Sequence, residues 1–350
     1  MARKLRIQPE NVCFHVVTRI AHREFFFDET EKDIVVRLIR NVEVFSGVQV
    51  IAYCVMSNHL HLLLFIDKPS NLLAWEQWQM LLHYDFEKDK DGRLYKVSNL
   101  TELSQDEVDE VRRCEKMTVL ERYEITKEKL VERIKVLMRP RAFDELMLKW
   151  QKMSAAELEC EYERFCVRMY DLSEFMKMLK QDISQYYNLR HKHTGGLWEG
   201  RFKDTFVERS VEAMSSVATY IDMNPVRAKI CQHPSEYKWN SYSAALEGDE
   251  TRRMGYNFIY DTSSGWETVC EVHEQQLEHR MAADTAEAAE KEEAVFTSGG
   301  IIGSESFVKR IVAMEDEAFP TGHKTPPVEF KVGGVALRVL RNLSILRKKG

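Results

Sequence analysis

The chain has 350 residues, 44% of them hydrophobic, and a formal net charge of -6 at pH 7. This length allows about two domains with a sizeable core. No apolar run approaches a membrane span, and the N-terminus lacks the apolar segment of a signal peptide. The seven cysteines include no C-x-x-C pair, which argues against a zinc ribbon or a disulfide framework and favours a cytoplasmic protein. The acidic balance does not indicate a nucleic-acid-binding protein, although a small basic face can bind DNA on an acidic protein.

The first part of the chain predicts alternating strands and a helix. Residues 12–20 are rich in β-branched and aromatic side chains and predict a strand, and an apolar stripe at helical spacing predicts a helix over 28–46. Residues 48–55 and 59–66 predict two further strands, joined as a hairpin at Ser57-Asn58. This order indicates an α+β fold, with an antiparallel sheet and helices packed on one face of it.

The middle of the chain changes character. A helix is predicted over 71–84, and residues 85–170 are dense in Glu, Lys and Arg with few strand signals, which predicts a helical insertion with a solvated charged surface. Ser173 is expected to cap a helix that runs to about residue 190. Residues 204–208 predict a strand, and Ser210 is expected to open a helix that ends near Asn224-Pro225.

The C-terminal part is mostly polar. An Ala/Glu-rich run at 282–294 predicts either a loose helix or a linker. Residues 301–314 predict a short amphipathic helix, and Arg338–Lys349 predict a basic, partly helical tail. We therefore expect a mostly helical C-terminal extension.

Two histidines, His59 and His61, lie two residues apart in the strand predicted over 59–66. Side chains at i and i+2 point to the same face of a strand, so both imidazoles project together. Two neutral imidazoles side by side are a ready pair of metal ligands. The alternative is a pair of core or edge histidines, because His-x-His alone occurs often by chance.

The helix that Ser210 opens carries a phenol and an amide four residues apart, Tyr220 and Asn224. That spacing places both on one side of the helix, beside its apolar stripe. Pro225 disfavours helical geometry for Asn224 and would hold the amide at a helix end. The alternative is a half-buried tyrosine followed by an ordinary helix-terminating Asn-Pro.

Several segments together resemble the HUH single-tyrosine transposases, above all the REP-associated tyrosine transposases and their insertion-sequence relatives. The segments are, in order, Val55–Leu64, Tyr186–Asn188, Gly196–Phe202, Tyr220–Ala228 and Trp239–Tyr242, with a weaker match at Gly299–Phe307. The resemblance implies a ferredoxin-like HUH palm. It places the catalytic domain in residues 1–84 and 171–246, the insertion in 85–170, and an extension with a linker and basic tail in 247–350.

The resemblance implies a metal-dependent single-stranded DNA endonuclease and strand transferase that cleaves near hairpins and rejoins the strands. Tyr220 matches the nucleophile that forms a 5′-phosphotyrosine, His59 and His61 match the metal-binding pair, and Asn224 matches the third ligand. The expected ion is Mg²⁺ or Mn²⁺, and imidazole ligands favour Mn²⁺. Ser57 stands where the family commonly has Pro. Insertion-sequence relatives work as dimers that can exchange the tyrosine helix, whereas REP-associated ones can act as monomers, so a homodimer stays open.

Cations beside aromatic rings suit a single strand through phosphate pairing and base stacking. The expected DNA-binding residues are Arg190, Lys192, Arg201, Lys203, Arg227 and Lys229. Trp198 and Phe202 lie in the loop over residues 190–203 that carries four of these cations, and both rings are at least as well explained as core residues. Tyr186 and Tyr187 rank behind Tyr220 as nucleophiles, because no amide lies four residues after either of them.

Two other functions remain open from the sequence. One is a regulator that binds structured single-stranded DNA without cleaving it. The other is a metal-dependent phosphoesterase that uses the two histidines for hydrolysis and leaves Tyr220 structural. A covalent protein–DNA adduct separates the tyrosine mechanism from both.

Overall fold

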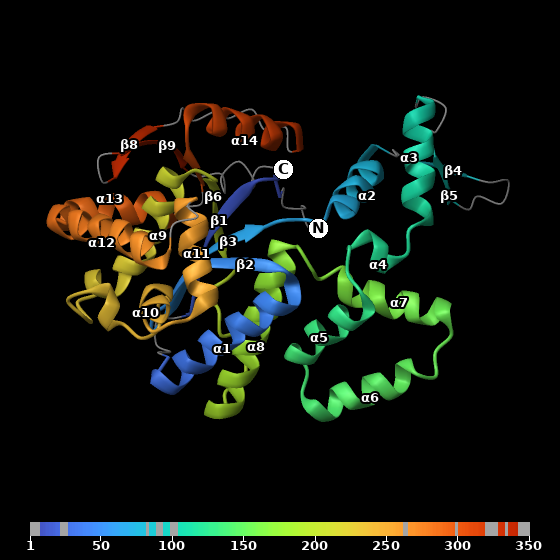
Figure 1. Cartoon of the computed structure of the whole chain (residues 1–350), viewed down its shortest axis with the longest axis horizontal. Coiled ribbons are helices and arrows are strands. Elements are labelled where there is room, and N and C mark those ends of the chain that lie inside the picture. Colours follow the sequence, from blue (N-terminus) through green and yellow to red (C-terminus); the bar gives the residue numbers. More distant parts are fainter. Residues whose placement is uncertain are drawn as a thin grey trace. The chain divides into compact units, whose positions relative to one another are not determined.

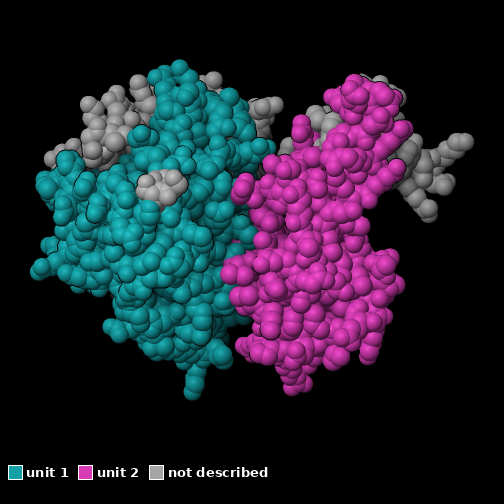
Figure 2. All heavy atoms as spheres, viewed as in Figure 1, with its two compact units in different colours: residues 1–43, 47–66, 171–350 teal, residues 44–46, 67–170 magenta. Residues whose placement is uncertain are grey.

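The computed structural model describes residues 8–21, 27–81, 84–88, 94–98, 104–261, 265–297, 300–318, 328–332 and 335–341. The chain forms two compact units, coloured separately in Figure 2. Unit 1 contains residues 1–43, 47–66 and 171–350, and unit 2 contains residues 44–46 and 67–170. The sequence-based boundary at 85 therefore differs from the structural one at Asp67. The helix over Ser70–Leu81 lies in unit 2 because it packs on helices of the insertion.

A seven-stranded sheet forms the centre of unit 1, in the order β2-β3-β1-β6-β7-β9-β8. Its strands are β1 (Val12–Arg19), β2 (Val48–Val55), β3 (His59–Ile66), β6 (Lys203–Glu208), β7 (Gly300–Gly303), β8 (Val328–Val332) and β9 (Val335–Arg341). The predicted α+β class is confirmed. All neighbouring strands are antiparallel except β6 and β7. That parallel pair is allowed because a long helical crossover joins the two strands.

The sheet is covered on both faces, so the prediction of helices on one face is wrong. Every residue of β3 after His59 is buried, and these residues point alternately to the two faces. A continuous apolar run of this kind marks a strand with packing on both sides. One face packs against α9 (Val211–Arg227) and α11 (Glu250–Tyr260), and α1 (Glu29–Ser46) and α8 (Leu172–His191) lie together on the other (Figure 1).

Side-chain caps fix where the helices of unit 1 begin. Asp28 and Glu31 form a capping box at the start of α1, and Ser210 caps α9 as predicted. The cap of α8 is Asp171, which accepts from the Glu174 N–H, so the assignment to Ser173 is wrong. The remaining helices of unit 1 are a 3₁₀ turn (Pro234–Glu236), α10 (Ser241–Leu246), α12 (Trp266–Ala283), α13 (Ala286–Thr297) and α14 (Glu305–Ala318).

Unit 2 is mainly helical, as predicted, but it also contains a hairpin that the sequence analysis missed. Its elements are α2 (Ser70–Leu81), β4 (Tyr84–Lys88), β5 (Leu94–Ser98), α3 (Gln105–Lys116), α4 (Val119–Arg122), α5 (Lys127–Leu137), α6 (Pro140–Trp150) and α7 (Ala155–Cys166). Asp91-Gly92, between the two strands, is a hairpin signal that the surrounding charge obscured. Capping boxes open α3, α4 and α7.

The C-terminal extension packs on the sheet. The Ala/Glu-rich run lies in α13, whose Val295 and Phe296 are buried, so the helix alternative is confirmed and the linker is wrong. The helix predicted over 301–314 is a strand, β7, followed by α14. Arg338–Arg341 lie in β9, not in a helical tail, and residues 342–350 lie outside the described ranges. Within those ranges, no helix has both the length and the apolar character needed to span a bilayer.

Candidate active site

One cavity of unit 1 brings together the four residues that the sequence predicted to act together. It has a volume of about 460 Å³ and is lined by His59 and His61 of β3 and by Tyr220 and Asn224 of α9. Its remaining lining is Arg19, Met56, Asn58, Arg227, Ala228, Ala289, Glu290 and Glu293. The strand that carries the histidines and the helix that carries the phenol therefore meet at one site.

The two histidines lie at the start of β3 with their ring centroids 4.9 Å apart and their planes at 77°. His61 is 1% exposed, and His59 is half-buried. Burial lowers the pKa of His59 to about 4, and burial lowers the pKa of His61 well below its usual range, with His59 adding to the effect. Both imidazoles are therefore neutral at pH 7, which is the form that binds a metal.

The α9 helix continues through Pro225 to Arg227, two residues past the predicted end near Asn224-Pro225, so the prediction that Asn224 leaves helical geometry is wrong. Proline has no N–H, which leaves the Ile221 carbonyl without its helical donor. The Asn224 amide replaces that donor: Nδ2 donates to the carbonyls of Ile221 (3.2 Å) and Tyr220 (2.9 Å). Both amide N–H groups are thereby used on the helix, and Oδ1 is the Asn224 atom left for the cavity.

Tyr220 is 2% exposed and is enclosed by rings. Its ring centroid lies 4.5 Å from that of Phe296, 5.7 Å from that of His61 and 5.8 Å from that of His15. Its hydroxyl has no hydrogen-bond partner among the described residues. Burial and then the Glu293 carboxylate raise the pKa of Tyr220, and Arg227 lowers it. The phenol is therefore a poor nucleophile until positive charge is placed beside it.

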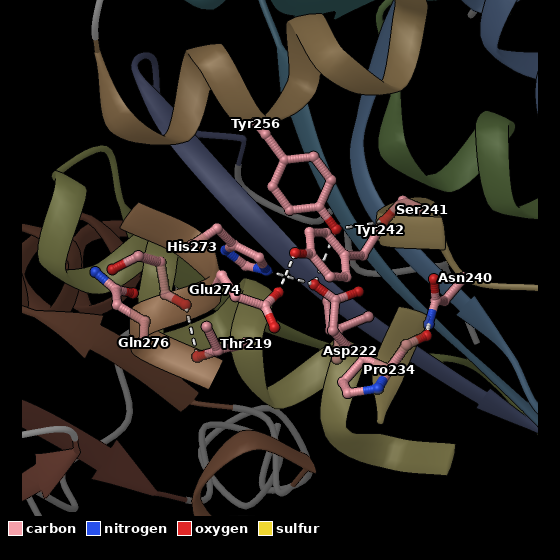
Figure 3. A network of polar contacts seen from close by, with 12 residues as sticks. Thr219, Asp222, Pro234, Asn240, Ser241, Tyr242, Tyr256, His273, Glu274 and Gln276 are labelled. Atoms are coloured by element: carbon pink, nitrogen blue, oxygen red, sulfur yellow. Dashed lines mark hydrogen bonds and ion pairs between the residues drawn. The ribbon is translucent and has the colours of Figure 1, made fainter. Parts of the chain in front are cut away.

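A buried polar network holds the opposite side of α9 (Figure 3). Asp222 Oδ2 accepts from His273 Nε2 at 3.0 Å and from the Tyr256 hydroxyl at 2.8 Å. The Tyr260 hydroxyl is 2.8 Å from His273 Nδ1, and Arg280 donates to the Ser216 carbonyl at 2.7 Å. These contacts tie the helix that carries Tyr220 to α11 and α12. We define the Asp222 network as Asp222, Tyr256, Tyr260 and His273.

The predicted DNA-binding cations fall into four settings, the last of which is a second cavity. Arg227 lines the cavity, pairs with Asp284 (2.8 Å) and Glu292 (2.6 Å), and keeps one buried nitrogen, Nη1, without a partner in the described chain. Arg190 pairs with Asp28 at 2.7 Å at the start of α1 and does not line the cavity. Lys192 and Lys229 are exposed, each with a positive φ.

Arg201 and Lys203 line a second cavity of about 480 Å³. Arg19 and Glu293 line both cavities, and their side chains pair at 3.0 Å. Arg201 and Lys203 themselves form no ion pair with any residue that the structure describes. Both residues are exposed.

The aromatic residues that competed for a role lie elsewhere. The Trp198 Nε1–H donates to Ser184 Oγ (2.8 Å) and to the Lys180 carbonyl (3.0 Å), which supports the core interpretation for that ring. Tyr187 stacks on His191 with centroids 4.2 Å apart. Neither Tyr186 nor Tyr187 lines the catalytic cavity.

Sequence reasoning missed four residues of the site: His15, Arg19, Glu293 and Phe296. His15 and Arg19 lie in the strand predicted over 12–20, but only the pairing of β1 with β3 places them beside the histidine pair. Glu293 and Phe296 belong to α13, whose packing the Ala/Glu-rich composition concealed. The one available signal in the sequence was His15, a single histidine in a strand of mostly apolar residues, which could have indicated a role in the site.

The residues present fit a divalent cation. The described ranges hold no group of three His, Cys, Asp or Glu side chains placed to bind a metal. The set is instead two neutral imidazoles and the oriented amide oxygen of Asn224, a mixed N/O set suited to Mn²⁺ or Mg²⁺. Because these three candidate ligands are uncharged, the full positive charge of an ion bound there would remain available to an anionic substrate.

Comparison with known proteins gives one partial family match and one similar solved structure. Residues 9–75 match the model of a family described as IS200-like transposases. A solved structure of a REP-associated tyrosine transposase bound to a REP hairpin is similar with a TM-score of 0.36 and 9% sequence identity, covering 71% of this chain and 87% of that chain. No curated protein sequence matches the chain.

Proposed function

We propose that this chain is an IS200-like transposase that cuts and rejoins single-stranded DNA near hairpins through a 5′-phosphotyrosine at Tyr220. The observation that carries the proposal is the composition of one cavity. A buried phenol without a hydrogen-bond partner in the described chain faces two neutral imidazoles and an oriented amide. A DNA-binding protein that does not cleave has no need of that combination.

The proposed reaction uses these groups in two reversible steps. The Tyr220 oxygen attacks the scissile phosphorus and loses its proton, the bond from phosphorus to the 3′ oxygen breaks, and the 3′ oxygen gains a proton. The reverse attack by a 3′ hydroxyl restores the phosphodiester and releases Tyr220, so religation needs no nucleotide cofactor. A Mg²⁺ or Mn²⁺ ion held by His59, His61 and Asn224 would neutralise charge on the phosphate oxygens.

Cationic side chains extend the substrate path from the cavity. Arg227 would contact a phosphate at the cavity, because its Nη1 has no partner among the described residues. The carboxylates of Asp284 and Glu292 already neutralise part of the Arg227 charge. Arg201 and Lys203 would bind the adjoining strand along the second cavity. Lys192 and Lys229 would contact phosphates at the surface, and Arg190 would do so only after leaving Asp28.

The test uses hairpin-bearing single-stranded oligonucleotides from the DNA that flanks the gene, with Mn²⁺ or Mg²⁺, and a denaturing gel. We expect a slow-migrating covalent adduct that is absent with chelator and absent in Tyr220→Phe. Tyr186→Phe is the matched control, because it removes a half-buried hydroxyl from α8 outside the cavity. Hairpin binding without an adduct under either metal would support the regulator instead. Cleavage that survives Tyr220→Phe would support the phosphoesterase.

Mixing two inactive variants tests whether a homodimer exchanges its tyrosine helix. Tyr220 and His61 of one chain line one cavity, so we expect a mixture of Tyr220→Phe and His61→Ala proteins to stay inactive. Recovered adduct formation in the mixture would show that two chains complete each site together.

A further inference from the structure

We propose that His15 is a positioning residue that presents His61 to the metal through Nε2, and that the backbone carbonyl of Phe296 sets the orientation of His15. This inference rests on the proposed function, because it concerns the metal-binding pair. It also assigns a role in the site to the C-terminal extension, through one residue of α13.

Sheet register brings His15 to His61. In the pairing of β1 with β3, Val17 lies opposite His61, and His15 is two residues further along the same face. The two rings are nearly parallel, at 14°, with centroids 5.4 Å apart. His15 is fully buried, so solvent does not compete for its ring nitrogens.

The direction of the hydrogen bonds follows from the carbonyl at one end. His15 Nδ1 lies 2.9 Å from the Phe296 carbonyl oxygen, which can only accept, so Nδ1 carries the proton. His15 is fully buried, and its hydrogen-bond partners among the described residues are a carbonyl and a second imidazole, with no carboxylate, which is a setting for the neutral ring with one donor nitrogen. His15 Nε2 is therefore an acceptor.

The second hydrogen bond, between His15 and His61, fixes the tautomer of His61. His15 Nε2 lies 3.1 Å from His61 Nδ1, so His61 donates through Nδ1–H. The lone pair of the neutral His61 ring is then on Nε2, and His61 lines the catalytic cavity. Partners on the second nitrogen of a metal-binding histidine commonly fix its tautomer in this way.

His59 has the same tautomer as His61, but a different contact supports it. Its Nδ1 lies 2.6 Å from Asn58 Oδ1, an amide oxygen that accepts, which also leaves the lone pair on Nε2. The two ligands thus have independent supports, one from the hairpin turn and one from β1 and α13. A change at His15 is expected to alter His61 and to leave His59 unchanged.

Phe296 connects the nucleophile with the hydrogen bonds that run from its own carbonyl through His15 to His61, which we call the His15 relay. Its carbonyl accepts from His15 while its ring packs on Tyr220, with centroids 4.5 Å apart. One residue of α13 therefore contacts both the support of a metal ligand and the attacking phenol. The extension is part of the catalytic domain in this respect, although it follows the matched family segment by more than 200 residues in the sequence.

The experiment measures the His61 tautomer in the metal-free protein, using ¹⁵N-labelled histidine and long-range proton–nitrogen correlation spectra. We expect the Nδ1–H tautomer at His61 in the wild type and its loss in His15→Phe, which keeps ring volume and removes the acceptor. His15→Gln places an amide oxygen near the Nε2 position and is expected to restore the tautomer. His273→Phe is the matched control, a fully buried histidine outside the relay.

Manganese affinity is the second readout, measured by electron paramagnetic resonance of free Mn²⁺. We expect His15→Phe to bind about 10–100-fold more weakly, as is typical for loss of an outer-shell partner, and His15→Gln to recover most of that loss. A wild-type His61 with its proton on Nε2 would overturn the inference even if His15→Phe failed to fold. So would unchanged tautomer and affinity in a folded His15→Phe protein.

The two proposals fail separately. Neither the tautomer nor the Mn²⁺ affinity depends on strand cleavage, so a protein that forms no DNA adduct but shows the relay would lose only the proposed function. If the protein forms the Tyr220 adduct but substitution of His15 changes neither the His61 tautomer nor the Mn²⁺ affinity, only this inference is wrong.

Discussion

Helix α9 presents polar groups on two sides, and the two sides differ in how those groups are satisfied. Toward the cavity, the Tyr220 hydroxyl, Asn224 Oδ1 and Arg227 Nη1 have no hydrogen-bond partner within the described residues. Toward α11 and α12, the Asp222 network and Arg280 make buried hydrogen bonds, with only Asp222 Oδ1 left over. One side of the helix is built for stability, and the other keeps its polar atoms available for a ligand.

Under the proposed mechanism, this contrast explains how α9 can present Tyr220 to a substrate while its other side is fixed by buried hydrogen bonds. Buried polar groups are normally paired, so unpaired ones concentrated in a single cavity mark the place where a substrate completes them. The paired side fixes the helix to the rest of unit 1 and keeps Tyr220 in position beside His61. Substitutions on the two sides are therefore expected to affect different quantities.

The largest expected effect on stability comes from the paired side. Asp222→Ala removes the acceptor for both His273 and Tyr256, and leaving a buried donor unsatisfied typically costs about 1–3 kcal/mol for each donor. We expect the free energy of unfolding in urea to fall by the sum for the two donors. The rate of adduct formation per folded molecule should change little. A rate loss without destabilisation would place Asp222 in the reaction.

The largest expected effect on chemistry at small cost in stability comes from the cavity side. Asn224→Ala removes the third ligand oxygen and one donor to the Ile221 carbonyl, a change of roughly 1 kcal/mol in the free energy of unfolding. Adduct formation is expected to slow by on the order of 100-fold, and excess Mn²⁺ should recover part of the rate. Equal losses of rate and stability would contradict the division between the two sides.

The same contrast shows what the sequence could and could not predict. The cavity side was predictable because spacing acts locally: His59 and His61 alternate on a strand, and Tyr220 and Asn224 lie one helical turn apart. Asn224 remained helical against expectation because its own side chain replaces the donor that Pro225 lacks. That compensation depends on side-chain geometry, which a pattern of residue types does not specify.

The paired side and the contacts of His15 were not predictable because they join segments that are far apart in the chain. Asp222 meets His273 across 51 residues, and His15 meets Phe296 across 281. The β-strands of the N-terminal half have strong apolar and β-branched signals, whereas α13 is a run of Ala and Glu whose burial depends on where it docks. The short strand β7 has only four residues and was absorbed into the helix predicted after it.

Acid should weaken the protein through the histidines next to the cavity. The unfolded pKa of histidine is about 6.5, and burial lowers the folded pKa of His15 to about 4. Between these values the unfolded chain binds more protons, so stability falls as the pH is lowered from 6.5 to 4, by about 3 kcal/mol for this group. Denaturant titrations of the metal-free protein should show this slope, and it should be reduced in His15→Phe. An unchanged slope would mean that other groups dominate the acid response.

The smallest expected effect concerns Arg19 and Glu293, which line both cavities and form the rim between them. Glu293 pairs with Arg19 and raises the pKa of Tyr220, so it opposes both phosphate binding and ionisation of the phenol. We expect Glu293→Gln to speed adduct formation at pH 7 by roughly 2–5-fold, since exposed charge pairs are worth at most about 1 kcal/mol. The gain should shrink in 0.5 M salt, where exposed charges are screened.

Glu290→Gln is the control for that last substitution, because Glu290 lines the same cavity without forming an ion pair in the described structure. If the gain arises from the release of Arg19 and from the field at Tyr220, Glu290→Gln should produce a smaller one. Equal gains would show that only the total negative charge of α13 matters. The rim would then act through its net field, and the specific Arg19–Glu293 pair would have no separate role at the site.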